Sequence, residues 1–181
     1  MTRSITQVGT PGDSLVAPLA RAAHYADSFS VCVPAGTFPD VDELARSCTQ
    51  LPGWVSALMR LRNAIVAPFG LKTEPDPALQ ERSAGAFGTG DRIGIFRVLS
   101  RSAQELLLGE NDKHLDFRFS LTLQTQSGGE CAIATTTVRY KNVWGRLYFA
   151  VVKPFHKLII PAMLRAAIAA RIRAAQTRIP P

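Results

Sequence analysis

The chain has 181 residues, of which 46% are hydrophobic and 19% are charged. This length suits one domain with a substantial core, and the composition excludes a disordered or coiled-coil chain. The 13 glycines and 12 prolines are too few for a low-complexity protein.

The first part of the chain predicts an arm, one strand and two helices. Residues 1–26 form an arm that can settle onto the body, and residues 28–33 are a β-prone run. Asp40 can cap a short helix, and Pro52 suits the start of a second one. The apolar residues of this second helix recur at helical spacing and predict one buried stripe. They are Trp54, Leu58, Leu61, Ile65 and Phe69.

A run of strands is predicted after a long loop at residues 74–91, because the apolar period changes there from about 3.6 to 2. Short turns between the strands indicate an antiparallel meander. In the clearest strand, alternation places Phe117, Phe119 and Leu121 on one face. The predicted strands cover residues 92–100, 104–109, 115–123 and 130–140.

Asn142 can cap a long final helix from about Val143 to Ala174, with Pro154 and Pro161 expected to kink or break it. Its expected buried side comprises Trp144, Tyr148, Val151, Val152, Phe155, Leu158 and Ile159. Because the apolar sheet face needs a cover, we expect this helix to lie across it. The element order is that of an α+β helix-grip fold, an antiparallel curved sheet wrapped around a long C-terminal helix.

A helix-grip domain over residues 27–164 would leave a cavity between sheet and helix, although a solid core gives the same apolar pattern. The candidate ligand-binding residues are Trp54, Arg97, Phe117, Phe119, Trp144 and Tyr148. Arg97 shares a predicted face with Ile93 and Leu99. We therefore expect it to be at least half buried and paired with a carboxylate or a ligand anion.

A second candidate is a polar cluster at a predicted hairpin, named here the hairpin cluster. It comprises Glu110, Asp112, His114, Asp116 and Arg118. A carboxylate beside His114 could orient the imidazole for acid–base chemistry, and Arg118 could hold an anion. The cluster lies opposite the apolar stripe, however, which favours a surface hydrogen-bond ladder over catalysis.

Other chemistry has little support in the sequence. Cys32, Cys48 and Cys131 form no CxxC pair and are interpreted as reduced, mostly buried thiols of a cytoplasmic protein. His156 is expected to be structural or solvated, and scattered histidines predict no metal site. No cofactor is expected, because the glycine-rich run at residues 85–90 precedes a strand and does not link a strand to a helix.

Charge is distributed unevenly along the chain. Residues 1–130 hold 12 basic and 14 acidic side chains, whereas residues 131–181 hold nine basic ones and no acid. A basic C-terminal extension at residues 165–181 could attract an anionic membrane surface through its arginines, and we expect it to contribute nothing to the fold. A frayed, solvated terminus is the alternative. No nucleic-acid motif accompanies the charge.

Three strings carry a family resemblance: LPGWVSALMRLRNAIVAPFGLKT (51–73), GDRIGIFRVLSRSAQELLLGENDKHLDFRFSL (90–121) and NVWGRLYFAVVKPFHKLIIPAML (142–164). Over roughly residues 25–165 the chain resembles a bacterial family of domains of unknown function, number 2867. The resemblance implies an α+β fold of the START-like helix-grip group. Some relatives are joined to an NAD(P)-binding Rossmann domain, which this chain does not contain. The family has no established catalytic residues to transfer.

Three functions follow as hypotheses. The first is binding of a small apolar or amphipathic ligand in the cavity between sheet and C-terminal helix. The second is an enzyme of cyclase or hydrolase type that uses the same cavity, which the absence of a catalytic motif disfavours. The third is a peripheral membrane or partner-binding module that uses the basic tail.

Overall fold

The computed structural model describes residues 4–51, 53–55, 57–58, 60, 85–93, 96–126 and 128–177. These residues form one antiparallel seven-stranded sheet in the order β1-β2-β7-β6-β5-β4-β3. The strands are β1 (Thr6–Val8), β2 (Tyr25–Val33), β3 (Arg92–Ile93), β4 (Phe96–Arg101), β5 (Glu105–Asn111), β6 (Leu115–Gln126) and β7 (Gly129–Tyr140). The helices are α1 (Ala17–Arg21), α2 (Val41–Thr49) and α4 (Val143–Thr177).

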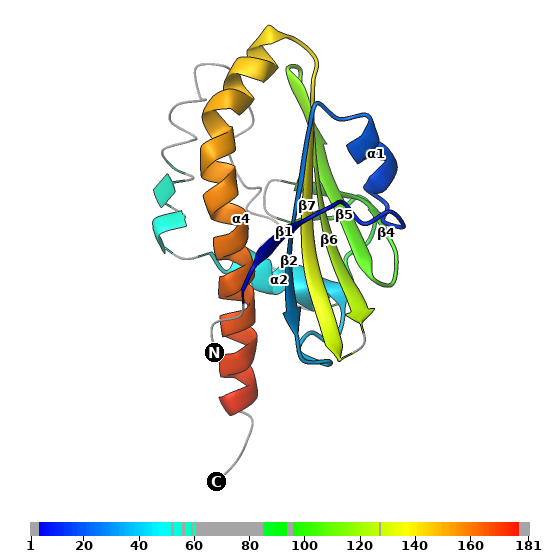
Figure 1. Ribbon diagram of the computed structural model, residues 1–181, viewed down its shortest axis with the longest axis vertical. Helices are drawn as coiled ribbons and strands as arrows, with labels where there is room; N and C mark the ends of the chain where they lie inside the picture. Colours follow the sequence, from blue (N-terminus) through cyan, green and yellow to red (C-terminus); the bar gives the residue numbers. More distant parts are fainter. Residues whose placement is uncertain are drawn as a thin grey trace.

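The layers confirm the predicted α+β class. The long helix α4 stands beside one face of the sheet, α2 lies between them at one end, and α1 lies on the opposite face (Figure 1). The predicted meander is present as β4 to β7, and β2 extends it by pairing with β7. A long C-terminal helix against a curved antiparallel sheet is the helix-grip arrangement.

The alternation predicted for β6 is confirmed. Phe119 and Leu121 belong to the main core together with Leu164 of α4. The cover of this face differs in one respect from the prediction, because α2 as well as α4 packs on it. The helix α2 contacts β5 and β6, whereas α4 contacts β7 and β2. The shorter helix therefore fills the part of the sheet that α4 does not reach.

Both predicted helix caps are present. The Asp40 carboxylate accepts a hydrogen bond from the Glu43 amide at 2.7 Å, at the start of α2. The Asn142 side-chain oxygen accepts one from the Gly145 amide at 3.1 Å, at the start of α4. Each cap satisfies an amide that has no partner within its helix. Pro154 and Pro161 lie inside α4 without ending it.

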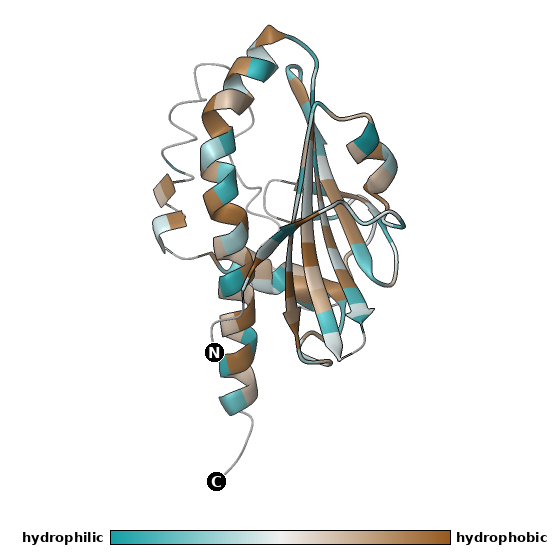
Figure 2. Cartoon of the chain, viewed as in Figure 1, coloured by the Kyte–Doolittle hydropathy of each residue, from teal (hydrophilic) through white to brown (hydrophobic). Residues whose placement is uncertain are grey.

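The prediction of the side of α4 that faces the core is correct for the half-buried Tyr148, Val152, Phe155 and Ile159 and wrong for the other three residues. Trp144, Val151 and Leu158 are exposed. The buried residues of α4 are Gly145, Phe149, His156, Ile160, Ala162, Met163, Leu164, Ala167 and Ile168. The reason is that α4 carries apolar residues on two opposite sides, so helical periodicity alone does not decide which side packs. Figure 2 shows hydrophobic residues recurring along the helix between hydrophilic ones.

The expectation that the chain after Leu164 contributes nothing to the fold is wrong for its first part. Ala167 and Ile168 lie in the main core. Arg171 donates to the Thr37 carbonyl at 3.1 Å and to the Glu43 carboxylate at 3.0 Å. The charge of this segment is therefore used in part to fix α4 to α2.

The described N-terminal residues before β2 lie at the edge and on the outer face of the sheet, and residues 25 and 26 of the expected arm belong to β2 itself. β1 pairs with β2, and Val16 is completely buried. The Leu15 amide donates to the Glu105 carboxylate at 2.7 Å. The arm thereby covers a layer of buried hydroxyl groups on this face. They belong to Ser28, Ser30, Ser120, Thr122, Thr135 and Thr137.

The interpretation of all three cysteines as reduced thiols is wrong for two of them. Cys32 on β2 and Cys131 on β7 lie directly opposite each other and form a disulfide. Their separation of 99 positions in sequence gave no spacing signal. Cys48 is a free, buried thiol.

The helix predicted from Pro52 to Phe69 lies mostly outside the described residues, as does the loop before residue 85. Residues 53–55, 57–58 and 60 are helical. Val55 is buried there, whereas Trp54 is 51% exposed and does not lie on a buried stripe.

Candidate functional site

A cluster of buried polar side chains lies between the sheet and α4, in an otherwise apolar layer. We name Tyr25, Asp27, Thr136 and His156 the buried polar cluster. Alternation along β2 places Tyr25 and Asp27 on the face that carries Phe29 of the core. Thr136 lies directly opposite Asp27 on β7. His156 reaches the same place from α4.

The Asp27 carboxylate receives one hydrogen bond on each oxygen. The Tyr25 hydroxyl donates to Oδ2 at 2.5 Å, and His156 Nε2 lies 3.0 Å from Oδ1. Because a carboxylate only accepts, the Nε2 atom carries the proton and Nδ1 is the remaining nitrogen of the ring. The side chains of His156 and Asp27 are 7% and 1% exposed, so this pair is shielded from water.

The partners of Asp27 distinguish it from the other buried carboxylates. Glu130 accepts from the amides of Gly36 and Phe38. Asp42 accepts from the Phe87 amide and the Arg101 guanidinium, and Glu105 from the Leu15 amide and the Ser120 hydroxyl. Those three acids fix loops and chain segments to the sheet or to α2. In the described part of the chain, Asp27 binds only titratable side chains.

The Thr136 hydroxyl has no hydrogen-bond partner among the described residues, although the residue is completely buried. Directly opposed residues of an antiparallel pair place their side chains next to each other, so the Thr136 side chain lies beside that of Asp27. A buried hydroxyl without a partner costs free energy, about 1–3 kcal/mol. Such groups are usually satisfied by water or a ligand.

Aromatic side chains border the buried polar cluster. Tyr25 lies 4.8 Å from the Phe149 ring, and the Lys153 ammonium lies 5.0 Å above the Tyr25 ring. Burial, together with the hydrogen bond to Asp27, raises the pKa of the Tyr25 hydroxyl well above its usual value. Tyr25 therefore stays protonated at neutral pH and acts as a donor. A second core cluster adjoins it, made of Leu115, Val138 and Phe149 with Tyr25, Phe117, Tyr140 and Tyr148 packed against them.

The candidate ligand-binding residues are not brought together by the structure. Phe117 and Tyr148 border the second core cluster, and Phe119 is buried opposite Thr136. Trp144 and Trp54, in contrast, are both more than half exposed. Only the first three therefore lie near the buried polar cluster.

Arg97 is exposed, and the prediction that it is half buried and paired is wrong. β3 pairs with β4 in antiparallel fashion, with Ile93 opposite Phe96. Ile93 and Arg97 therefore belong to different strands, and alternation does not continue from one to the other. Val98 is the β4 residue that enters the core.

The hairpin cluster forms a network along the β5–β6 turn. Asp116 binds Lys141 at 2.7 Å, and Glu110 binds Arg92 at 3.2 Å. Arg118 donates to the Asn111 side chain at 2.6 Å, and the Asp112 carboxylate accepts from the His114 amide at 3.1 Å. The His114 ring lies beside the Asn142 amide group, and no described carboxylate contacts it. This arrangement is a ladder of structural bonds.

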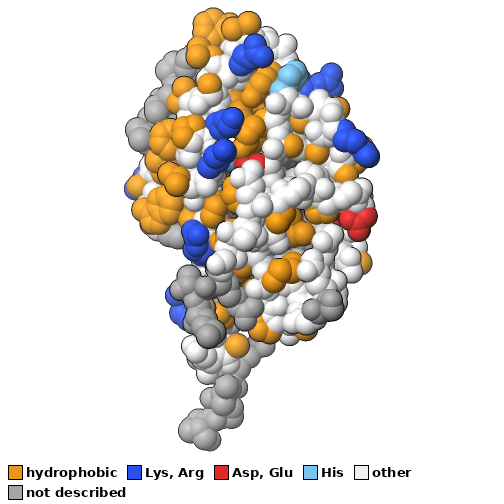
Figure 3. Space-filling view, viewed as in Figure 1, with side chains coloured by type: hydrophobic (Ala, Val, Ile, Leu, Met, Phe, Trp, Pro, Cys, Tyr) orange, Lys and Arg blue, Asp and Glu red, His pale blue; other side chains and the backbone are white. Residues whose placement is uncertain are grey.

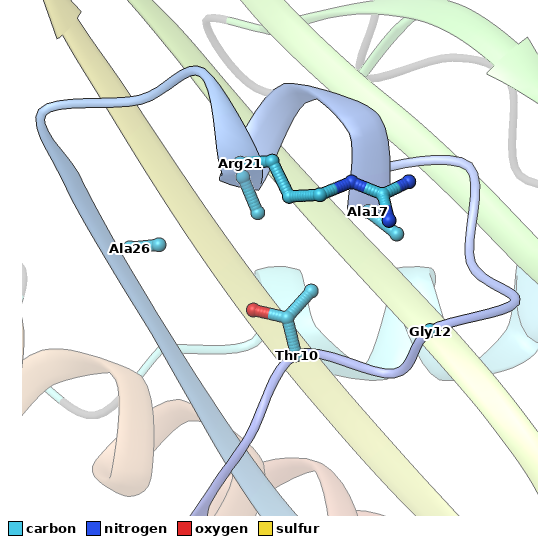
Figure 4. A pocket seen from close by; sticks show the side chains of 6 residues that line it. Thr10, Gly12, Ala17, Arg21 and Ala26 are labelled. Carbon is cyan, nitrogen blue, oxygen red and sulfur yellow. The ribbon is translucent and has the colours of Figure 1, made fainter.

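Two open surface pockets lie elsewhere on the described part of the chain. One, of about 250 Å³, lies on the outer face under α1 and is lined by Thr10, Gly12, Ala17, Ala20, Arg21 and Ala26 (Figure 4). The other, of about 290 Å³, lies at the end of β2, β6 and β7 beside the disulfide. Neither adjoins the buried polar cluster, and neither contains a buried charge.

The sequence reasoning did not find the buried polar cluster. The first strand was expected to begin at residue 28, which left Tyr25 in the arm and Asp27 outside the strand, whereas β2 begins at Tyr25. The signal was present, since Tyr25, Asp27 and Phe29 alternate on one face. His156 was expected to be structural or solvated, because it lies between two lysines with no metal ligand nearby in the sequence. Its partner Asp27 lies 129 positions away, so no local pattern connects the two residues.

Two further properties concern only the described residues. No group of three or more histidine, cysteine, aspartate or glutamate side chains among them could hold a metal ion. No described helix is long and apolar enough to cross a membrane.

A sheet curved over a long C-terminal helix defines the helix-grip class of α+β proteins. In this protein the buried polar cluster lies between these two layers. Residues 19–163 match the family described as "Protein of unknown function (DUF2867)", and the chain belongs to this family. No curated protein and no solved structure matches the chain. The START-like grouping stays a prediction.

Proposed function

We propose that the protein binds a small amphipathic molecule between the sheet and α4, with the polar end of the molecule at the buried polar cluster. The observation that carries this proposal is the Thr136 hydroxyl, which is fully buried beside Asp27 and lacks a partner among the described residues. A polar group of a ligand would satisfy it. Small-molecule sites combine apolar walls with a few placed polar groups, and the surroundings of Thr136 have this composition.

The apolar part of the ligand has a matching surface. Phe117, Tyr140 and Tyr148 are only partly buried against the second core cluster, and Tyr25 and Phe149 contact each other beside it. Aromatic rings offer large contact areas with little rotamer entropy to lose. We therefore assign the tail of the ligand to these rings.

The charge of the cluster favours a neutral polar group over an acid. The Asp27 carboxylate already accepts from Tyr25 and His156, and a second carboxylate beside it would be repelled in this buried layer. A ligand hydroxyl or carbonyl oxygen can instead bond to the Thr136 hydroxyl. The class of ligand proposed is a neutral alcohol, ketone or ester with an apolar tail.

Nile red, a neutral dye with one carbonyl group, tests this proposal. We expect its fluorescence to rise on binding and the Thr136→Val variant to bind about fivefold more weakly, since one hydrogen bond is worth about 1 kcal/mol. Thr135→Val is the matched control. Thr135 is the neighbouring residue on the outer face, where its hydroxyl lies 2.9 Å from that of Ser28.

Equal affinity of the two variants for Nile red would contradict the proposal. So would native mass spectrometry of the purified chain that finds no bound molecule, together with no dye binding by the wild type. Circular dichroism of both variants checks that each one folds.

Catalysis in the same place is the second candidate function. The Asp27–His156 pair has the parts for proton transfer, because a carboxylate that holds one imidazole nitrogen leaves the other free to take a proton. No described nucleophile contacts His156, which favours binding over an acyl-transfer enzyme. If the protein is an enzyme, the Asp27→Asn variant should co-purify with a molecule of different mass from that held by the wild type.

A further inference from the structure

The first half of α4 exposes a row of large apolar side chains. We name Val143, Trp144, Leu147, Val151 and Leu158 the α4 surface. Trp144 is 56% and Leu158 61% exposed, and the others are also exposed. Figure 3 shows hydrophobic side chains gathered along this part of the molecule, with lysine and arginine side chains among them.

The spacing places these residues on one side of the helix. Val143, Leu147 and Val151 follow each other at intervals of four, and Leu158 follows after seven, which returns to the same side at 3.6 residues per turn. Phe149, His156 and Ile160 point from the opposite side into the layer beside the sheet. The α4 surface is therefore the outer side of a helix whose inner side is already packed.

An apolar row of this extent differs from ordinary surface residues. Single exposed hydrophobic side chains are common, but contiguous apolar patches on a soluble domain mark interaction sites. Among the other exposed large hydrophobic residues, Val8 and Leu19 lie apart on β1 and α1. The concentration on α4 thus calls for a partner.

The charges beside the α4 surface specify the partner. Arg146, Lys153 and Lys157 recur at intervals of seven and four, so they form a second row next to the apolar one. Residues 131–181 contain no acidic side chain that could neutralise this row. Lys153 lies over the Tyr25 ring, which places the basic row along the seam between α4 and β2.

We propose that the α4 surface docks onto an anionic phospholipid bilayer, with the helix lying in the plane of the interface. Helices of this kind combine an apolar side with lysine and arginine, and they insert the apolar side at the boundary between headgroups and acyl chains. Tryptophan prefers that boundary, and flexible basic side chains reach from it to the phosphates.

Charge disfavours the other occupants of this surface. A second copy of the chain would bring two rows of Arg146, Lys153 and Lys157 together, and like charges at an interface oppose association. Protein interfaces are also depleted in lysine.

The proposal differs from the expected role of residues 165–181, since Ile168 is buried and Arg171 binds Glu43. It is independent of ligand binding at the buried polar cluster.

Sedimentation with vesicles tests the docking. The full chain should pellet with vesicles of phosphatidylcholine and phosphatidylglycerol at low salt and stay in solution with phosphatidylcholine alone. The Leu147→Ser/Leu158→Ser variant should bind at least about tenfold more weakly, since it removes apolar contact. The matched control, Val8→Ser/Leu19→Ser, changes two exposed residues elsewhere and should bind as the wild type does.

A second variant tests the electrostatic part. Arg146→Gln/Lys157→Gln should lower the preference for anionic vesicles several-fold and weaken the salt dependence, because fewer charges face the lipid. Three results would overturn the proposal. They are a wild type that ignores anionic vesicles at low salt, an apolar variant that binds as well as the wild type, and a dimer in light scattering that Leu147→Ser/Leu158→Ser abolishes.

Discussion

At the scale of single residues, Gly145 determines how closely α4 approaches the β5–β6 hairpin. It is buried in the first turn of the helix, where its amide donates to the Asn142 cap. A Cβ atom at this position would overlap the His114 carbonyl oxygen and contact the Leu115 side chain at 3.4 Å. The helix can begin here only because the residue has no side chain.

The first prediction at this scale concerns Gly145→Ala. Alanine favours helices over glycine by about 1 kcal/mol, yet we expect the variant to be destabilised by about 1–3 kcal/mol because the overlap lies against backbone. Gly12→Ala is the control, since a Cβ there would meet nothing within 4 Å. Thermal melting of both variants decides, and a Gly145→Ala variant that melts at or above the wild type would contradict this packing.

At the scale of elements, the last turns of α4 were expected to be dispensable and are part of the core. Ala167 and Ile168 pack in the main cluster with Leu44 of α2, and Arg171 binds Glu43 of the same helix. The helix α4 therefore holds α2 against the sheet. After Arg173, the residues Ala174, Ala175 and Gln176 are exposed.

A chain that ends after Leu164 should lose about 3–5 kcal/mol of stability, because it removes a large buried side chain and leaves a gap over α2. A chain that ends after Arg173 keeps every one of these contacts and should unfold within about 0.5 kcal/mol of the full chain. Urea unfolding measures both. If the shorter chain does not fold, the Ile168→Ala variant tests the same contacts with a smaller loss of stability. If the chain that ends after Leu164 is as stable as the chain that ends after Arg173, the residues between them do not stabilise the fold.

The elements also show what the sequence could and could not predict. Strand β6 alternates cleanly because one of its faces is apolar and the other polar, so its core side was predictable. The α4 helix is apolar on two sides, so the predicted core side combined half-buried residues such as Phe155 with exposed ones such as Leu158. The buried polar cluster depends on a contact between Asp27 and His156 from distant segments, which no local pattern encodes.

At the scale of the whole molecule, one covalent link encloses most of the domain. The Cys32–Cys131 disulfide joins neighbouring strands β2 and β7. Its cysteines are separated by 99 positions in sequence, and the segment between them includes α2 and strands β3 to β6. Closing a loop of this length restricts the unfolded chain and is worth up to about 4–5 kcal/mol in the chain-entropy description. Disulfides of this kind persist in oxidising compartments and are rare in the cytoplasm. The cytoplasmic location stays a prediction, and the oxidation state of Cys32 and Cys131 tests it.

Counting reactive thiols in three states tests this link. The native protein should react with iodoacetamide at none of its cysteines, because Cys32 and Cys131 are bonded and burial raises the pKa of the Cys48 thiol to about 12. Denaturation without a reductant should expose one thiol, and reduction should expose all three. Reductant should also lower the melting temperature of the wild type and of Cys48→Ala equally, but not that of Cys32→Ala/Cys131→Ala. Three reactive thiols in the denatured, unreduced protein would mean that the link does not form and that the stability of the domain rests on its core alone.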